Sequence, residues 1–365
     1  MIVKVDPFRI SMVAGVVSNI TVPVEEYCQG LGTEKKIKRL IRETGFQKLS
    51  VAEKGVCASD MCFQAAEKVL ESSQVDKDSI GALIFVSQTP DYRAPSTAYV
   101  LQKRLGLANS LVAFDINLGC SGFVYGLYVC AMILATMSHK KALLCCGDVC
   151  SSAMNPNSPG KRAITGDAGT CVLVEPVKEK KESVYFNIDS YGDRFNALYV
   201  PNGSSRHPFT LKNNKIDTDN QNNFSVMDGL AILDFTMNEV CDNINRLFDH
   251  YKIISAEIDA ALLHQPNLIL VKAIQEKLGF SDKQLVCNSQ DIGNTSSASI
   301  PLLLTEIGEA WQERGNSLSL LSGFGIGLSV SSVLMDLQNT VCLKTMKYDN
   351  RYTFMTREVG GYSYD

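Results

Sequence analysis

The sequence lacks an excess of basic residues. Its 365 residues include 35 Lys and Arg against 39 Asp and Glu, which gives a net charge of −4. Domains that bind nucleic acids usually carry a basic excess, so the composition argues against a nucleic-acid partner. With 45% hydrophobic residues, the chain has the composition of a globular protein with one large domain or two fused ones.

The sequence also lacks a Cys-x-x-Cys pair that would suggest a zinc site, although it contains 12 cysteines. Several of them, including Cys130, Cys171 and Cys287, lie inside apolar runs. The first ten residues contain three charged side chains, which is unlike a secretory signal peptide. We therefore predict a reducing, cytoplasmic location with free and mostly buried thiols, and we expect neither a bound metal nor a cofactor.

No charged residue occurs between residues 116 and 138, a length that could suggest a membrane span. Strand-like apolar runs lie on both sides, at residues 111–116 and 142–146. The order of strand, turn, buried helix and strand is typical of α/β proteins. We predict a buried helix here and no association with a membrane.

Two parts of the chain repeat the same order of landmarks, which predicts an internal duplication. An apolar strand precedes Gln-Thr-Pro at residues 88–90, and another precedes His-Gln-Pro at residues 264–266. In each part a run that opens with Leu-Val, at residue 111 or 285, reaches a Gly followed by Cys120 or Asn294. Any two βαβ units share some of this order, which is the alternative interpretation. A duplication places Cys120 and Asn294 at equivalent helix starts, where backbone N–H groups concentrate positive potential.

The repeat suggests how the chain is divided. We predict an N-terminal half at residues 1–180 that carries a nucleophilic cysteine. A C-terminal half at residues 181–335 would carry His and Asn, and residues 336–365 would form an extension. The boundary falls near the charged run at residues 178–182. The Asn-rich residues 213–223 are predicted to form a surface insertion.

Cys120 differs from the other cysteines in its context. It lies between Gly119 and Ser121-Gly122, and such glycines permit a sharp strand-to-helix turn that exposes one side chain. The N-terminus of the following helix would lower the pKa of the thiol and favour the reactive thiolate. We predict that Cys120 is a nucleophile; a buried structural cysteine is the alternative.

Only four histidines occur, and His264 alone ends an apolar strand, the place where α/β active sites are built. His139 and His207 lie in polar surroundings, so we expect both to be exposed. Taken alone, His264 could equally be a core histidine, and Asn294 could be an ordinary helix N-cap. Together with Cys120, they favour a Cys/His acyl-transfer site.

Two glycine-rich segments are predicted to be turns. The Gly-Phe-Gly-Ile-Gly sequence at residues 323–327 lacks the spacing of a dinucleotide-binding loop. A tight turn there could bring backbone N–H groups close to a substrate carbonyl, as an oxyanion hole requires. The Gly-Asp-Ala-Gly sequence at residues 166–169 is interpreted as a structural turn.

These segments together resemble the β-ketoacyl-acyl-carrier-protein synthase III branch of the thiolase superfamily. The resemblance extends from about residue 10 to residue 335, and its matching motifs are at residues 119–123, 264–267, 293–299 and 323–327. It implies an α/β fold, namely a duplicated thiolase-like fold with five layers, αβαβα, and a homodimer. It also implies an acyltransferase that forms a β-ketoacyl thioester by decarboxylative Claisen condensation.

The resemblance further implies a role for each residue. Cys120 would take an acyl group from an acyl-CoA or acyl-carrier-protein thioester, while the backbone N–H groups of Cys120 and Ile326 hold the oxyanion. His264 and Asn294 would stabilise the enolate formed when malonyl-acyl-carrier protein loses CO₂. The residues expected to bind substrate are Ile326, Asn267, Ala94 and Phe324.

The sequence departs from the family pattern near the expected entrance to the site. Arg39 and Glu43 replace a Trp and an Arg that hold the adenine of coenzyme A, and Ala94 replaces a Phe that caps the acyl pocket. We therefore predict changed donor recognition in an enzyme of fatty-acid or specialised lipid biosynthesis. Two alternatives remain open: an acyltransferase that makes an ester or amide without decarboxylation, and a non-catalytic partner subunit.

Overall fold

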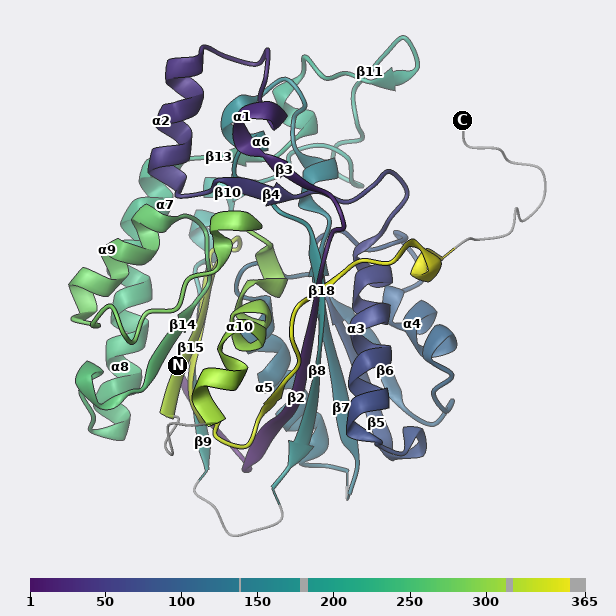
Figure 1. Ribbon diagram of the computed structural model, residues 1–365, viewed down its shortest axis with the longest axis vertical. Coiled ribbons are helices and arrows are strands. Elements are labelled where there is room, and N and C mark those ends of the chain that lie inside the picture. The colour runs from purple at the N-terminus through teal and green to yellow at the C-terminus, as the bar shows by residue number, and fades with distance from the viewer. Residues whose placement is uncertain (138, 178–182, 313–317, 355–365) are drawn as a thin grey trace.

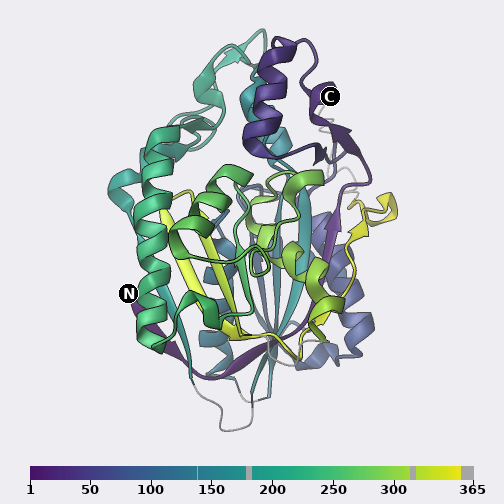
Figure 2. The same ribbon diagram turned by 60° about the vertical axis from the view of Figure 1, so that its left-hand side comes forward.

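The computed structural model describes residues 1–137, 139–177, 183–312 and 318–354. Two β-sheets form the centre of the molecule, and helices lie between the sheets and on their outer faces (Figure 1). The same layers are visible in the rotated view (Figure 2).

The first sheet has seven strands in the order β17-β2-β8-β7-β5-β6, with β18 also paired to β2. The strands are β2 (Phe8–Val17), β5 (Ile80–Val86), β6 (Val112–Ile116), β7 (Lys141–Asp148), β8 (Ala168–Pro176), β17 (Val341–Cys342) and β18 (Met346–Lys347). β5 is buried along its whole length, which explains its continuous apolar sequence.

The second sheet has five strands in the order β1-β9-β16-β15-β14. The strands are β1 (Ile2–Val5), β9 (Val184–Ser190), β14 (Ala260–Leu263), β15 (Leu318–Gly325) and β16 (Ser329–Asp336). β14 is again buried on both faces.

Six helices complete the layers (Figure 1). The helices between the sheets are α5 (Gly122–Leu134) and α10 (Ser299–Gln312), those outside the first sheet are α3 (Ala58–Ser73) and α4 (Thr97–Leu105), and those outside the second sheet are α8 (Cys241–Tyr251) and α9 (Leu268–Leu278). The predicted five-layer αβαβα fold is confirmed. The predicted buried helix is α5, which packs between two sheets and is therefore apolar on most sides. In the described ranges, no helix is long and apolar enough to cross a membrane.

Shorter elements lie beyond one end of the sheets (Figure 1). One group is β3 (Thr21–Pro23), α1 (Val24–Tyr27), α2 (Glu34–Thr44), β4 (Lys48–Ser50) and α6 (Pro159–Arg162). The other is β10 (Leu198–Tyr199), β11 (Leu211–Lys212), β12 (Lys215–Ile216), β13 (Val226–Met227) and α7 (Gly229–Phe235). β11 and β12 form an exposed hairpin, so the predicted surface insertion is confirmed.

The strand pairing confirms the internal duplication. β5 is parallel to β7, and β8 and β2 follow with antiparallel pairing. β14 is likewise parallel to β15, and β16 and β9 follow with antiparallel pairing. The counterpart of β6 is reduced to a single parallel bridge between Ala261 and Leu285, which corresponds to the parallel pairing of β5 with β6.

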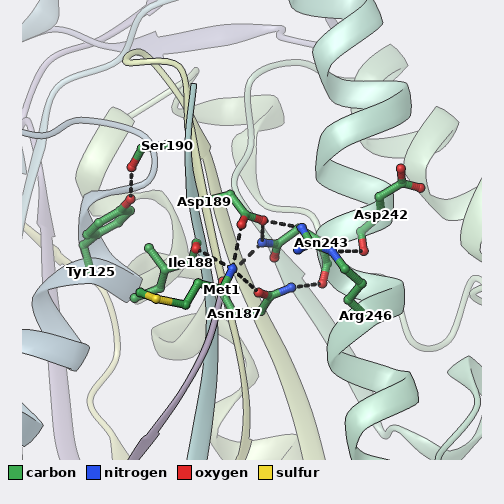
Figure 3. Close-up of polar contacts among 9 residues, drawn as sticks. All are labelled: Met1, Tyr125, Asn187, Ile188, Asp189, Ser190, Asp242, Asn243 and Arg246. Carbon is green, nitrogen blue, oxygen red and sulfur yellow. Dashed lines mark hydrogen bonds and ion pairs between the residues drawn. The ribbon is translucent and has the colours of Figure 1, made fainter. Parts of the chain in front are cut away.

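Two short segments cross the predicted boundaries between the halves. β1 pairs with β9 in the second sheet, and β17 and β18 of the extension pair with β2 in the first sheet. The amino group of Met1 bonds to Asn187, Ile188 and Asp189 at 2.7–3.0 Å, and Asp189 also contacts Asn243 of α8 (Figure 3). The N-terminal strand thus belongs to the sheet of the second half, and the strands of the extension belong to the sheet of the first half. The predicted boundary at residues 178–182 lies outside the described residues.

All 12 cysteines are free, and seven of them are buried. Cys130 and Cys171 are buried as expected, whereas Cys287 is exposed. The interpretation of Cys287 as a buried residue of an apolar run is therefore wrong. The segment around it forms only an isolated bridge, at Leu285, and leaves the thiol at the surface. His139 and His207 are exposed, as predicted.

Candidate active site

The turn after β6 places Cys120 against the end of β15. A Cβ atom on Gly325 would lie 2.7 Å from Cys120 Cβ and 3.2 Å from its sulfur, and Gly325 has a φ of +155°. A Cβ atom on Gly323 would lie 2.9 Å from the carbonyl oxygen of Cys120. Only glycine permits this close approach. The glycine-rich segment at residues 323–327 therefore borders the cysteine, as the sequence predicted.

Burial, followed by the charge of Asp148, raises the pKa of the Cys120 thiol to about 12. The Ser296 side chain, followed by the backbone N–H groups of Cys120 and Ile326, acts in the opposite direction. The predicted lowering of this pKa is wrong, because the thiolate loses more hydration on burial than these groups restore.

His264 directly follows β14 and is buried. Its Nδ1 lies 2.8 Å from the hydroxyl of Ser299, the first residue of α10, and its ring packs edge-on against Phe324 with a centroid distance of 5.5 Å. Burial lowers the pKa of His264 to about 3. The imidazole is thus neutral at neutral pH, and Nε2 is the ring nitrogen left to contact a substrate.

Asn294 is held by the N-terminal half of the chain. Its N–H donates to the carbonyl of Ile164 at 2.9 Å, and its own carbonyl accepts from Gly166 N–H at 2.8 Å. Its side-chain oxygen accepts from Ser296 N–H at 2.9 Å, so the amide nitrogen is left to donate. A Cβ atom on Gly166 would lie 1.8 Å from the carbonyl oxygen of Ile292. Gly166 thus has the structural role that the sequence predicted for its segment.

Asp148 is a buried residue of the site that the sequence analysis missed. One carboxylate oxygen accepts from Gln88 N–H at 2.7 Å and from the Ser87 hydroxyl at 3.1 Å. The other accepts from Ser297, from its hydroxyl at 2.7 Å and its N–H at 3.2 Å. Asp148 therefore joins the strand ends of the first half to the segment that follows Asn294. Its position at the end of β7 was the signal that could have identified it.

The residues expected to bind substrate divide into two groups. Phe324 contacts His264, and Ile326 supplies an N–H group to the cysteine sulfur. Asn267 is the N-cap of α9, where its side chain accepts from Leu270 N–H at 2.9 Å. Ala94 is exposed on the loop between β5 and α4. The structure therefore joins Phe324 and Ile326 to the cluster around Cys120, whereas Asn267 has the contacts of a helix cap.

Arg39 and Glu43 lie one turn apart on the exposed surface of α2, where they form an ion pair with each other. The positive and negative charges at these two positions therefore offset one another. A guanidinium that is engaged in this way is less available to stack on an adenine ring.

The duplicated five-layer architecture places the protein in the class of thiolase-fold enzymes. The family described as 3-Oxoacyl-[acyl-carrier-protein (ACP)] synthase III matches residues 114–192, and its C-terminal counterpart matches residues 248–337. A β-ketoacyl-[acyl-carrier-protein] synthase III of Streptococcus agalactiae is 31% identical over 80% of this chain and 88% of its own length. The corresponding protein of Campylobacter fetus is 30% identical over 81% of this chain and 88% of its own length.

A crystal structure of a 3-oxoacyl-(acyl-carrier protein) synthase from Burkholderia xenovorans is also similar, with a TM-score of 0.88 and 31% identity. The likeness covers 95% of this chain and 99% of that one. The chain belongs to the β-ketoacyl-[acyl-carrier-protein] synthase III family and is an acyltransferase of the condensing type.

Proposed function

We propose that the protein forms a β-ketoacyl thioester by joining an acyl group on Cys120 to the two-carbon unit of malonyl-acyl-carrier protein. The observation that carries this proposal is the pair of N–H groups at the Cys120 sulfur, with neutral His264 on the adjoining strand. A neutral imidazole and an amide can both donate hydrogen bonds to an oxygen that is becoming negative.

In the first half-reaction, the sulfur of Cys120 attacks the carbonyl carbon of a thioester donor. The N–H groups of Cys120 and Ile326 hold the resulting oxyanion. The bond to the donor sulfur then breaks, and the donor thiol leaves with the proton that Cys120 gave up.

In the second half-reaction, malonyl-carrier protein loses CO₂, and its thioester becomes an enolate. The enolate oxygen accepts hydrogen bonds from His264 Nε2 and the Asn294 amide. The enolate carbon attacks the acyl-Cys120 carbonyl, the carbon–sulfur bond breaks, and Cys120 leaves as a thiolate that takes a proton from water. The product is a β-ketoacyl-carrier protein.

Acylation is tested by intact-mass spectrometry after incubation with a panel of acyl-CoA and acyl-carrier-protein thioesters. Cys120→Ala should lose the covalent adduct and remain folded. Cys287→Ala is the matched control, because it removes an exposed thiol and should keep the adduct. An adduct that persists in Cys120→Ala would contradict the proposal.

Decarboxylation is tested with malonyl-acyl-carrier protein. In His264→Ala and Asn294→Ala, CO₂ release should fall roughly 10²-fold or more, the scale of losing one preorganised donor. Acylation of Cys120 should fall much less. If the unaltered protein never consumes malonyl thioester, an ester-forming or amide-forming acyltransferase is the better assignment.

For the donor, we propose an acyl-carrier protein or an acyl chain longer than acetyl. The Arg39–Glu43 ion pair and the small, exposed Ala94 side chain support this proposal. The test compares kcat/KM for acylation by acetyl-CoA, octanoyl-CoA and octanoyl-carrier protein. A clear preference for acetyl-CoA would contradict it.

We also propose that the protein is a cytoplasmic homodimer. Free cysteines throughout the chain are consistent with a reducing compartment. β6 is an edge strand of the first sheet, and a second copy could pair with its open side. Cell fractionation and light scattering, respectively, test the two statements.

A further inference from the structure

Ser296 has a buried hydroxyl that the steps above do not use. The residue is 4% exposed, and its Oγ has no hydrogen-bond partner. Leaving a buried hydroxyl without a partner is unfavourable, because the group loses its hydrogen bonds to water. Such a group at an active site calls for an explanation in terms of function.

The hydroxyl lies beside Gly119, the residue that precedes the nucleophile. A Cβ atom on Gly119, the residue before Cys120, would lie 2.8 Å from Ser296 Oγ. The backbone of Ser296 has a left-handed φ of +53°, which a non-glycine residue rarely adopts. The Asn294 side chain holds it there by accepting the Ser296 N–H at 2.9 Å. The same hydrogen bond therefore orients the Asn294 amide and holds the backbone that carries the Ser296 hydroxyl.

We propose that Ser296 is a further residue of the reaction, whose hydroxyl donates a hydrogen bond to the Cys120 sulfur when that sulfur carries negative charge. This inference rests on the proposed role of Cys120 as the acylated nucleophile. The donor acts when the thiol ionises for attack and again when the sulfur leaves the condensed product. Its hydrogen bond adds to the effect of the N–H groups of Cys120 and Ile326. The hydroxyl keeps its own proton throughout the reaction.

The charges around the sulfur show why such a donor is needed. Burial of the site, followed by the carboxylate of Asp148, raises the pKa of Cys120, and the Ser296 hydroxyl acts in the opposite direction. The same hydroxyl also opposes the rise that burial causes in the pKa of Asp148 and of Cys150. His264, on the adjoining β14, is neutral and offsets none of the negative charge.

The test measures alkylation of Cys120 by iodoacetamide, mapped by peptide mass spectrometry so that the exposed Cys287 does not interfere. Alkylation requires the thiolate, so its dependence on pH reports ionisation without any substrate. Ser296→Ala and Ser296→Gly both remove the hydroxyl, but only glycine tolerates the left-handed backbone. Thr295→Val is the matched control, because the Thr295 hydroxyl is also buried without a partner.

In both Ser296 variants, the alkylation rate at a given pH should fall about tenfold, the effect of raising the thiol pKa by about one unit. The ultraviolet absorbance of the thiolate, taken as the difference from Cys120→Ala, should shift to higher pH in parallel. Thr295→Val should match the unaltered protein.

Unchanged rates in both variants would overturn the inference. A fall in Ser296→Ala that Ser296→Gly does not share would assign the effect to backbone strain, and an equal fall in Thr295→Val would assign it to loosened packing. Either result also overturns the role of the hydroxyl. If mass spectrometry finds no acylation of Cys120 in the unaltered protein, the proposed function itself has failed.

Discussion

Gly166 lies directly against the segment that carries Asn294. Its N–H donates to the Asn294 carbonyl, and the 1.8 Å separation between its would-be Cβ and the Ile292 carbonyl oxygen involves backbone that cannot simply rotate away. Gly166→Ala should therefore displace Asn294 and lower CO₂ release from malonyl-carrier protein by roughly 10²-fold, with a smaller effect on acylation. Steady-state assays of both half-reactions measure this difference.

Gly160 provides the control for that substitution. Nothing lies within 4 Å of the position that its Cβ would take. Gly160→Ala should leave both half-reactions unchanged. Equal loss of acylation and decarboxylation in Gly166→Ala would point to general unfolding and contradict the prediction.

The buried His264 makes stability depend on pH. Its pKa falls from 6.5 to about 3 on folding because of burial. As the pH falls from 6.5 toward 3, the unfolded chain binds a proton that the folded chain does not, so folding stability declines over this window. At pH 5 the free energy of unfolding is lower by about 2 kcal/mol for this reason. His264→Gln should remove this part of the decline between neutral pH and pH 5, measured by urea denaturation.

His207 is the comparison for this effect, because it is exposed in a surface loop. His207→Gln should keep the pH dependence of the unaltered protein. A His264→Gln variant with an unaltered pH dependence would show that folding does not shift the pKa of His264, and the burial argument for a neutral imidazole would then fail.

The positions of the site residues could be predicted from sequence better than their chemistry. Cys120 and His264 each follow a strand, and Asn294 follows Gly293 in a turn, so each of the three has a local signal in the sequence. The pKa of Cys120 could not be predicted, because it depends on Asp148 and on burial between two halves that are far apart in sequence. Ser299 and Ser296 gave no local signal, since serines are common at helix starts.

At the scale of single elements, Arg104 of α4 anchors the end of the described chain. It forms an ion pair with Asp60 of α3 at 2.7 Å, and the two side chains are 7% and 2% exposed. Its guanidinium lies 4.1 Å from the ring centroid of Phe63, and Phe354 N–H donates to Asp60. One buried pair therefore joins two helices to residues that follow β18.

Removing one partner of a buried pair leaves an uncompensated charge. Arg104→Ala should lower the free energy of unfolding by about 3 kcal/mol. Lys68→Ala breaks an exposed pair with Glu71 and should cost less than about 1 kcal/mol. Chemical denaturation followed by circular dichroism measures both. Similar losses in the two variants would contradict the assignment of Arg104 as an anchor.

The elements that sequence patterns missed are those decided by long-range contacts. The segment that matches β6 begins at Leu285 and forms one bridge to Ala261. The preceding Gln284 side chain donates to the carbonyls of Ser255 and Ile258, both at 2.7 Å. β1 and β17 are short, and each pairs with a strand more than a hundred residues away in the sequence. No local periodicity encodes such pairing.

For the whole molecule, the two halves are not independent units. Asp148 of the first half binds Ser297 of the second, and Asn294 of the second half is held by Ile164 and Gly166 of the first. The predicted duplication explains why each half supplies a strand end to the site. It does not by itself explain the contacts that join the halves, which are side-chain bonds at Asp148 and backbone bonds at Asn294.

The open side of β6 carries the proposal of a homodimer. The strand pairs only with β5 in the sheet order of the described chain, and its residue Val112 is exposed. Asp115, the one charged residue in the strand, is used internally, since it accepts from the N–H groups of Thr97 and Ala98. The strand thus has no outward charge to discourage pairing, which an isolated edge strand usually requires.

Val112→Lys should place a positive charge from each copy at this edge and convert the dimer to a monomer, as measured by light scattering after size-exclusion chromatography. Ile254→Lys is the control, because Ile254 is also an exposed apolar residue but follows α8 on the outer layer of the second sheet. It should leave the dimer intact. A monomeric unaltered protein, or a Val112→Lys variant that remains dimeric, would place the contact elsewhere and remove β6 from the interface.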